Sequence, residues 1–255
     1  MKPFKRYGHI PVALFVILSL SIQGCSDSST DSKRNYPVSW SSGYRMADFL
    51  STEVTIEKQQ DLRYLLEVPW YTEIVVTGTK SSDQAIFSNC KTYLSEATEK
   101  TRTLRENEIN AFLVLAMMCR ATDVLLNATA AHRSNIPTDF FNESTPQKFP
   151  VALALVISES EFAKYAQDKS IKYWGDVNKK HQIEFISNDQ VEFHHDGGIQ
   201  RLALVGRGDF NGDETEDILI SSRDSVVGGS YFNIRLFALS VDTEGEWQLI
   251  EEFTF

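Results

Sequence analysis

The chain has 255 residues and a formal net charge of −10 at pH 7. This excess of acidic side chains argues against binding to nucleic acid or to an anionic lipid surface, and it suits a soluble body, a cation ligand or a basic partner protein. The length is enough for one sizeable folded core or two small ones.

The first 24 residues have the layout of a secretory signal. A basic start precedes an apolar run over residues 10–22, and Gly24-Cys25 follows directly. The apolar run is too short to cross a bilayer as a helix, which takes about 20 residues. We therefore expect residues 1–24 to be a signal peptide, and its removal would leave the mature chain more acidic still.

Residues 22–25, Ile-Gln-Gly-Cys, resemble the lipobox of bacterial lipoproteins. The resemblance implies cleavage before Cys25 and acylation of that cysteine, and several acyl chains on one residue give a stable membrane anchor. It also implies a location in the outer membrane, facing the periplasm, because Ser26 rather than aspartate follows the cysteine. The alternative is a cleaved secretory signal with an incidental cysteine.

Residues 25–35 contain the candidate lipidated cysteine and a polar stretch, SDSSTDSKRN, without any apolar residue. Such a stretch cannot bury enough surface to offset its loss of chain entropy, so we expect a disordered tether. Residues 36–255 are then expected to form a single domain, with a helical part over about residues 36–146 and a sheet part over about residues 147–255.

The first part of this domain is predicted to be mainly helical. Residues 46–66 have scattered apolar positions compatible with a helix, and a second helix is expected to begin at Ser82 and to run through Leu94. The β-rich residues 71–77 predict one strand between them. Residues 104–130 give the strongest helix signal, because apolar side chains recur at helical spacing and also occupy the other faces. This central helix is expected to be buried on most sides.

Cys90 and Cys119 are the two cysteines that remain once Cys25 is lipidated. In an oxidising periplasm such a pair is expected to form a disulfide. The disulfide would join the second predicted helix to the central one and would stabilise the fold by about 3–4 kcal/mol in the chain-entropy model. Two buried free thiols and a zinc site are the alternatives, although no histidine lies close in sequence to complete a zinc site.

From His181 onward the apolar pattern changes to a period of two, which indicates strands. Short turn sequences separate the segments, so the strands are expected to form an antiparallel meander. The predicted strands are residues 182–186, 190–195, 199–205, 218–222, 231–240 and 246–255. One face of this sheet needs a partner, and the helical part is available. The predicted fold is therefore α+β: a helical N-terminal half, with a buried central helix, packed on a C-terminal antiparallel β-meander.

An acidic loop between two of these strands is the main candidate site. It has the sequence DFNGDETED, and the apolar run Ile-Leu-Ile follows it. Calcium prefers oxygen ligands at about 2.3–2.6 Å, and three nearby carboxylates repel one another without a cation. The loop therefore predicts one calcium ion with a structural role. Its ligands would be the side chains of Asp209, Asn211, Asp213 and Asp217 and the carbonyl of Thr215.

The pattern Asp-x-Asn-x-Asp-x-x-x-Asp between two apolar strands resembles the calcium loop of FG-GAP repeats, which build the integrin β-propeller. It departs from that family at Glu214, where the usual loop has glycine. An EF-hand matches less well, because its invariant glycine and bidentate glutamate would fall on Glu214 and Ile220. A β-propeller would need several copies of the loop, and the chain has one. A solvated acidic hairpin turn is the alternative without a cation.

The chain lacks the sequence motifs of several large enzyme classes. It has no Gly-x-Ser-x-Gly elbow, His-Glu-x-x-His motif, Walker loop or dinucleotide fingerprint. His194 and His195 are neighbours, but alternation along a strand would send them to opposite faces of the sheet. The chain is therefore expected not to be an enzyme.

Three functions are compatible with these observations. The leading hypothesis is a calcium-binding outer-membrane lipoprotein that acts as a non-enzymatic binding protein. A more specific version is an immunity protein that neutralises a toxin in the periplasm, because lipidated, acidic, disulfide-bonded single domains resemble such proteins. Its partner would be a basic protein. A cell-envelope hydrolase without a recognisable motif is the third possibility.

Overall fold

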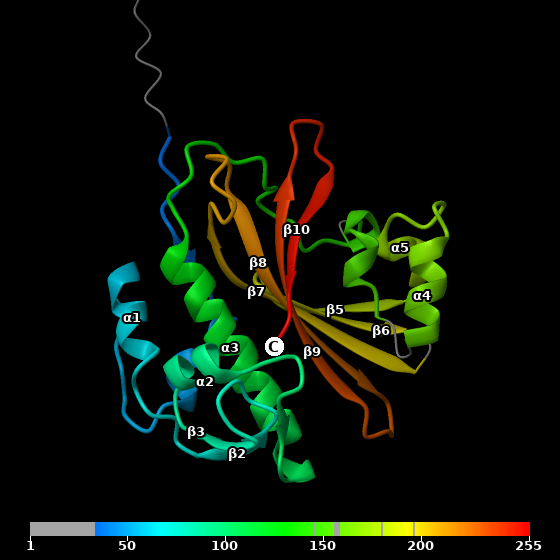
Figure 1. Cartoon of the computed structure of the whole chain (residues 1–255). Coiled ribbons are helices and arrows are strands. Elements are labelled where there is room, and N and C mark those ends of the chain that lie inside the picture. Colours follow the sequence, from blue (N-terminus) through cyan, green and yellow to red (C-terminus); the bar gives the residue numbers. More distant parts are fainter. Residues whose placement is uncertain (1–33, 145, 156–158, 180, 196) are drawn as a thin grey trace, which may run out of the picture. The chain divides into compact units, whose positions relative to one another are not determined.

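The computed structural model describes residues 34–144, 146–155, 159–179, 181–195 and 197–255. The predicted signal peptide, Cys25 and nearly all of the predicted tether lie outside these residues. Figure 1 shows the helices and strands of the described part of the chain.

The largest element of the described residues is a seven-stranded antiparallel sheet (Figure 1). Six of its strands lie in the order β10-β9-β8-β7-β6-β5, and β1, Ser39–Trp40, pairs with the C-terminal end of β7. The six are β5 (Gln182–Ser187), β6 (Gln190–His195), β7 (Gly198–Gly208), β8 (Asp217–Val226), β9 (Phe232–Val241) and β10 (Trp247–Phe253). Each strand pairs with its neighbour in the chain. The C-terminal sheet therefore lies where the period-two pattern predicted it.

Both faces of this sheet are covered, and each carries its own hydrophobic core. Alternate residues divide between the two: Leu219 and Leu236 belong to the first core, whereas Ile220 and Phe237 belong to the second. Strands buried on both faces read as continuous apolar runs, as residues 218–220 do. In Figure 1, α3 lies on one side of the sheet, and α4 and α5 lie on the other.

The N-terminal part of the domain is not the helical half that the sequence predicted. It contains a second, three-stranded sheet in the order β3-β2-β4. The strands are β2 (Ile74–Thr77), β3 (Gln84–Phe87) and β4 (Arg102–Thr103), and the helices are α1 (Leu62–Leu65), α2 (Cys90–Glu96) and α3 (Ile109–Asn127). Short 3-10 turns cover Met46–Phe49, Gln59–Asp61 and Glu106–Glu108. The prediction of an α+β fold with a helical N-terminal half is therefore wrong.

Part of the error lies in residues 46–66, which form only two 3-10 turns and the four-residue α1. This stretch contains the β-branched residues Thr52, Val54, Thr55 and Ile56, and β-branched side chains lower helix propensity. The bridge between Leu50 and Trp70 also ties its extended backbone to the segment that leads into β2.

The other part of the error lies in β3. Gln84–Phe87 follows a Ser-Asp pair that looks like a helix start, but it pairs antiparallel with Ile74–Thr77. The following helix, α2, begins later. Its N-cap is Asn89, whose side chain accepts a hydrogen bond from the Thr92 N–H (2.8 Å). Pairing with a neighbouring strand thus decided the structure of a segment whose local signal was ambiguous.

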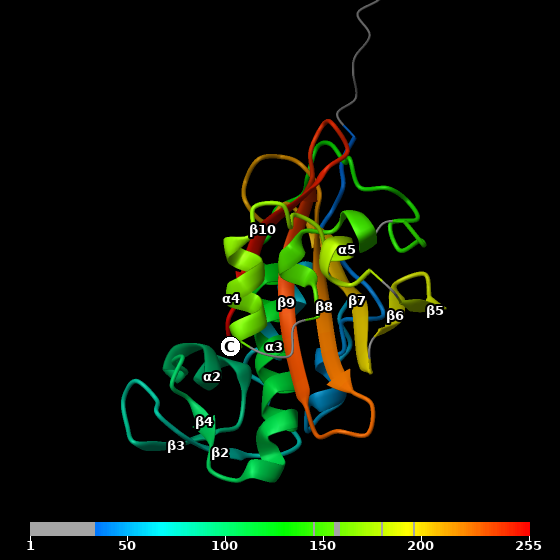
Figure 2. The ribbon, with the colours of Figure 1, turned by 90° about the vertical axis from the view of Figure 1, so that its right-hand side faces the viewer.

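Helix α3 is the one long helix of the described residues, and it packs on the first face of the sheet (Figure 2). By length and composition alone Glu106–Asn127 could cross a membrane, but half of its apolar stretch is buried within the fold. The disulfide between Cys90 and Cys119 joins α2 to α3, as the sequence predicted. These contacts account for the apolar composition of α3 as that of a core helix.

The second face of the sheet is covered by the chain between α3 and β5, a cover that the sequence did not predict. This segment contains 3-10 turns at Pro146–Lys148 and Val151–Leu153, α4 (Glu159–Gln167) and α5 (Trp174–Val177). Phe149 and Trp174 are fully buried. Their rings lie 4.9 Å from that of Trp247 and 5.1 Å from that of Phe193, respectively. The Trp174 Nε1–H also donates to Gln200 Oε1 (2.7 Å), which places a polar bond inside this core.

Candidate functional site

The candidate calcium loop connects β7 to β8. Gly208 and Asp217 are paired positions of the two strands, so the loop leaves and re-enters the ladder at one place. Gly212 (φ 83°) and Glu214 (φ 65°) turn the chain through the left-handed region. That region costs residues other than glycine roughly 1–2 kcal/mol. Glu214, where the sequence departs from the FG-GAP pattern, is the one non-glycine residue with positive φ in the described part of the chain.

Asp209 organises the backbone of the loop. Its Oδ1 accepts hydrogen bonds from the N–H groups of Gly212 (2.7 Å) and Asp213 (3.3 Å). Its Oδ2 accepts a bond from the N–H of Glu214 (2.9 Å). Asp213 in turn accepts the Thr215 N–H at 2.7 Å. The two carboxylates therefore serve as acceptors for the turn, a role that aspartates also have in loops without a cation.

Asp217 closes the loop from inside the fold. Its side chain is fully buried, and its Oδ2 accepts the Phe210 N–H (2.9 Å). Its Oδ1 has no hydrogen-bond partner among the described residues. Burial, together with the negative charges of Asp213 and Asp209, raises the pKa of Asp217 to about 6, although the Phe210 N–H and the Ser240 hydroxyl act in the opposite direction. An unpaired carboxylate oxygen at this depth destabilises the loop unless a donor or a cation reaches it.

The chain that follows α3 packs on the loop. Thr129 and Asp209 exchange backbone hydrogen bonds of 3.1 and 2.9 Å. The Arg133 guanidinium donates from Nε to Thr215 Oγ1 (2.7 Å) and from Nη2 to the Asp213 carbonyl (2.8 Å). Arg133 therefore brings positive charge to an acidic turn, and the loop ties the C-terminal end of α3 to the sheet.

The predicted ligands lie together in one turn, but their carboxylates do not converge as a closed metal shell would require. Where side chains are described, one group of three or more His, Cys, Asp or Glu residues has all its ligand atoms within 4.8 Å of one another, and it lies elsewhere. To bind calcium, Asp209 and Asp213 would exchange bonds to backbone N–H groups for bonds to the ion. Asp217 Oδ1 would need no such exchange, because it is unpaired.

A cavity of about 600 Å³ lies beside the loop. Asn211, Asp213 and Thr215 line it from the loop, and Arg133 and Ser240 line it from neighbouring segments. Solvent, and with it an ion, can therefore reach the outer side of the predicted site. The buried Asp217 forms its inner side.

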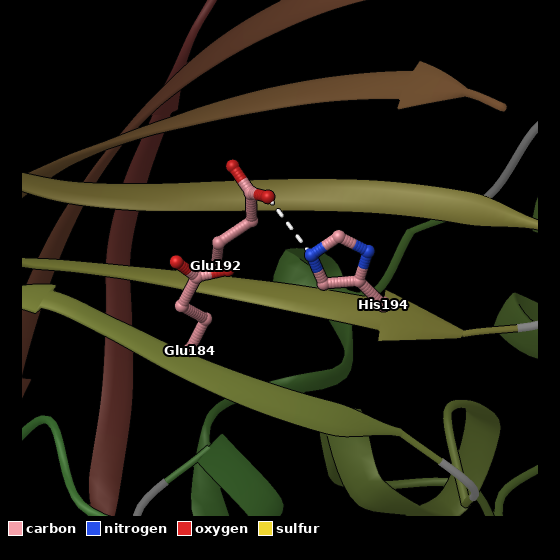
Figure 3. Close-up of side chains that lie close together, drawn as sticks. All are labelled: Glu184, Glu192 and His194. Atoms are coloured by element: carbon pink, nitrogen blue, oxygen red, sulfur yellow. Dashed lines mark ion pairs between the residues drawn. The ribbon is translucent and has the colours of Figure 1, made fainter.

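The group that does meet the metal-ligand spacing is Glu184, Glu192 and His194 on β5 and β6 (Figure 3). Glu184 and Glu192 are paired positions of the two strands, and His194 Nε2 lies 2.9 Å from Glu192 Oε1. Two carboxylates and an imidazole are ligands that suit zinc or manganese. The other oxygen of Glu192 accepts a bond from Arg201 Nε (2.8 Å), so both oxygens of this carboxylate have protein partners.

The molecule thus presents two acidic groups of different chemistry, an oxygen-rich loop and a mixed carboxylate and imidazole group. Comparisons with protein-family models, curated proteins and solved structures find no match for this chain. The loop offers the donor set of a hard cation such as calcium. The Glu184, Glu192 and His194 group offers that of a transition metal.

Sequence reasoning placed the two histidines correctly but missed the partners of His194. His195 lies on the opposite face, where its ring is 6.0 Å from that of Trp174. The signal for the missed group was the short Ser-Asn-Asp connection between two predicted strands, because a hairpin of that length sets Glu184 opposite Glu192. Residues i and i+2 then share a face, which adds His194.

Proposed function

We propose that this chain is a calcium-binding, non-enzymatic binding protein, anchored by a lipid on Cys25 to the outer membrane and facing the periplasm. The signal layout and lipobox pattern of residues 1–25 support the anchor. The loop between β7 and β8 would hold one calcium ion. Its ligands would be Asp209, Asn211, Asp213, Asp217 and the carbonyl of Thr215.

The unpaired Oδ1 of Asp217 is the observation that supports calcium over a plain acidic turn. Hydrogen bonds within the turn explain Asp209 and Asp213 without a cation, but none of them reaches this buried oxygen. Leaving a buried acceptor unsatisfied costs about 1–3 kcal/mol, and more for a charged group. A hard cation that takes carboxylate oxygens would turn the same atom into a ligand.

A structural role for the ion follows from the segments that meet at the loop. The loop joins β7 to β8, and the chain after α3 bonds to it through Thr129 and Arg133. An ion that orders the loop would therefore help to hold α3 against the central strands of the sheet. Binding at a hundredfold excess over Kd stabilises the native state by about 2.7 kcal/mol. For a domain of this size, that corresponds to a rise in melting midpoint of roughly 5–10 °C.

The test is a melting curve of the purified protein in millimolar calcium, millimolar magnesium or chelator. Calcium is expected to raise the midpoint, and magnesium to substitute poorly because it demands a tighter octahedral shell. Asp213→Ala and Asp217→Asn are expected to lose the response. Asp61→Ala is the matched control, because Asp61 also accepts two backbone N–H bonds, from Glu57 (3.1 Å) and Lys58 (3.0 Å), but lies outside the loop.

Two results would end the calcium proposal. One is a wild-type midpoint that is the same in calcium and in chelator. The other is a calcium response that survives equally in Asp213→Ala, Asp217→Asn and Asp61→Ala, since the ion would then bind elsewhere. Asp213→Ala removes an exposed side chain, so its melting curve remains interpretable even if the buried Asp217→Asn variant folds poorly.

A further inference from the structure

Three arginines line a hollow on the first face of the sheet. The hollow has a volume of about 440 Å³. Arg201 and Arg223 reach it from β7 and β8, and Arg45 reaches it from the chain that follows β1. Gln190 and Ser221 add polar groups to the lining, and two methionines of α3 form part of another wall. The hollow therefore combines several hydrogen-bond donors with a concentration of positive charge.

The strand register sets two of these arginines against each other. Arg201 and Arg223 are directly paired positions of β7 and β8. Side chains at paired positions leave the same face of a sheet, and like charges placed there destabilise it. Desolvation, together with the positive charges of Arg201 and Arg45, lowers the pKa of Arg223. The chain has a net charge of −10, so this cluster of positive side chains is a local exception.

The acidic side chains around the hollow leave one guanidinium uncompensated. Glu192 accepts a bond from Arg201 Nε at 2.8 Å, and Asp48 accepts one from Arg45 Nε at 2.6 Å. Within the described ranges, the Arg223 side chain forms no hydrogen bond or ion pair, and its contact is with the ring of Phe232, 5.9 Å from the guanidinium carbon to the ring centroid. Arg223 is also accessible to solvent, so a ligand can reach it.

A second hollow, of about 370 Å³, shares Arg45 and Arg223 with the first. The rings of Phe49, Tyr71 and Phe232 line it. The two guanidinium groups therefore stand between a polar recess and an aromatic one. A ligand with an anionic group and an attached ring would find a surface of matching chemistry for each part.

We propose that Arg45, Arg201 and Arg223 bind a phosphate group, and that the aromatic recess takes a ring or apolar part of the same ligand. Guanidinium groups bind phosphate through paired, charge-assisted N–H···O bonds. Glu192 and Asp48 already offset part of the charge of Arg201 and Arg45. A doubly charged phosphate supplies the further charge that Arg223 lacks and relieves the repulsion between the arginines.

The phosphate site is separate from the calcium loop. Arg223 lies six residues along β8 from Asp217, which corresponds to roughly 20 Å of strand. Neither Asp209 nor Asp213 lines either arginine hollow. The phosphate site therefore stands whether or not the loop binds calcium.

The test is calorimetric titration of the purified protein with inorganic phosphate and with phenyl phosphate, at matched ionic strength. Wild type is expected to bind both, and phenyl phosphate more tightly because it also fills the aromatic recess. Arg223→Gln is expected to weaken both by about tenfold or more, since charged hydrogen bonds are lost. Arg63→Gln is the matched control, an exposed arginine on α1 away from both hollows, and is expected to leave both affinities unchanged.

A melting curve without phosphate separates lost binding from lost structure. Arg223→Gln removes one member of a like-charged pair, so its midpoint is expected to equal or exceed that of wild type. Asp213→Ala is expected to keep its phosphate affinity. The proposal is overturned if wild type binds neither probe, if Arg223→Gln keeps its affinity, or if Arg63→Gln loses as much. Phenyl phosphate that binds no better than inorganic phosphate would overturn the role of the aromatic recess.

Discussion

Replacing Arg235 of β9 with methionine measures how firmly the second face of the sheet is covered. The Arg235 guanidinium lies 3.1 Å from Asp224 Oδ2 and donates to the carbonyls of Ala152 (2.7 Å) and Ala154 (2.8 Å). It therefore joins the central strands to the chain that covers them. The Asp224 side chain is only 1% exposed. Without Arg235, the buried Asp224 carboxylate would lose its positively charged partner, and only uncharged hydrogen-bond donors would remain.

The expected cost follows from these contacts. Removing one partner of a buried ion pair costs about 3–5 kcal/mol. Each lost carbonyl bond adds about 1 kcal/mol, but contributions within one network do not add fully. We therefore expect Arg235→Met to lower the free energy of unfolding by about 4 kcal/mol. For a domain of this size, the melting midpoint would fall by roughly 10 °C.

The assay is urea unfolding followed by tryptophan fluorescence, on Arg235→Met, Asp224→Asn and the double variant. The double variant is expected to lose at least about 1 kcal/mol less unfolding free energy than the two single variants lose together. The reason is that Asp224→Asn removes the negative charge that Arg235→Met leaves without a partner. Arg63→Met, on an exposed arginine, should stay within about 0.5 kcal/mol of wild type. A cost below about 1 kcal/mol for Arg235→Met, or strict additivity, would refute the reasoning.

Two further predictions concern the candidate calcium loop and the proposed lipid anchor. Glu214→Gly is expected to raise the free energy of unfolding by about 0.5–1 kcal/mol in urea, because glycine adopts a φ of 65° without strain. Glu214→Ala keeps the strain, so an equal gain from alanine would contradict this explanation. Cys25→Ser is expected to move the protein from the membrane to the soluble fraction and to remove the mass of its acyl chains. A variant that still fractionates with membranes at an unchanged mass would contradict the lipid anchor.

The C-terminal sheet was predictable because its signals are local. Each strand from β5 to β10 carries its own apolar pattern and ends at a turn sequence, and consecutive strands pair. β1 was not predicted, since Ser39–Trp40 is a strand only through its pairing with β7, far along the chain. Gln84–Phe87 was missed for a different reason: it forms a hairpin with Ile74–Thr77, the strand just before it, but the Ser-Asp pair in front of it looked like a helix start. Where pairing with another segment decides the structure, the pattern of one segment alone does not suffice.

The sites divide in the same way. The acidic loop and the pair Cys90 and Cys119 are visible in the sequence, because spacing or a simple count brings them to notice. The unpaired oxygen of Asp217 required the packing around it. The hollow lined by Arg45 and Arg223 brings together residues that are far apart in the chain. Their proximity depends on the pairing of distant segments in the fold, which no local sequence pattern contains.

The first described residues of the chain join the sheet beside the loop between β7 and β8. Tyr36 bridges Ala131, and β1 pairs with the end of β7 that leads into the loop. The same stretch after α3 bonds to Asp209 through Thr129. A force applied to the N-terminus would load these few backbone bonds first, and β1 would peel from β7 before any strand of the meander separated. A pulling force on the chain would thus disturb the structure next to the loop before it disturbed the rest of the sheet.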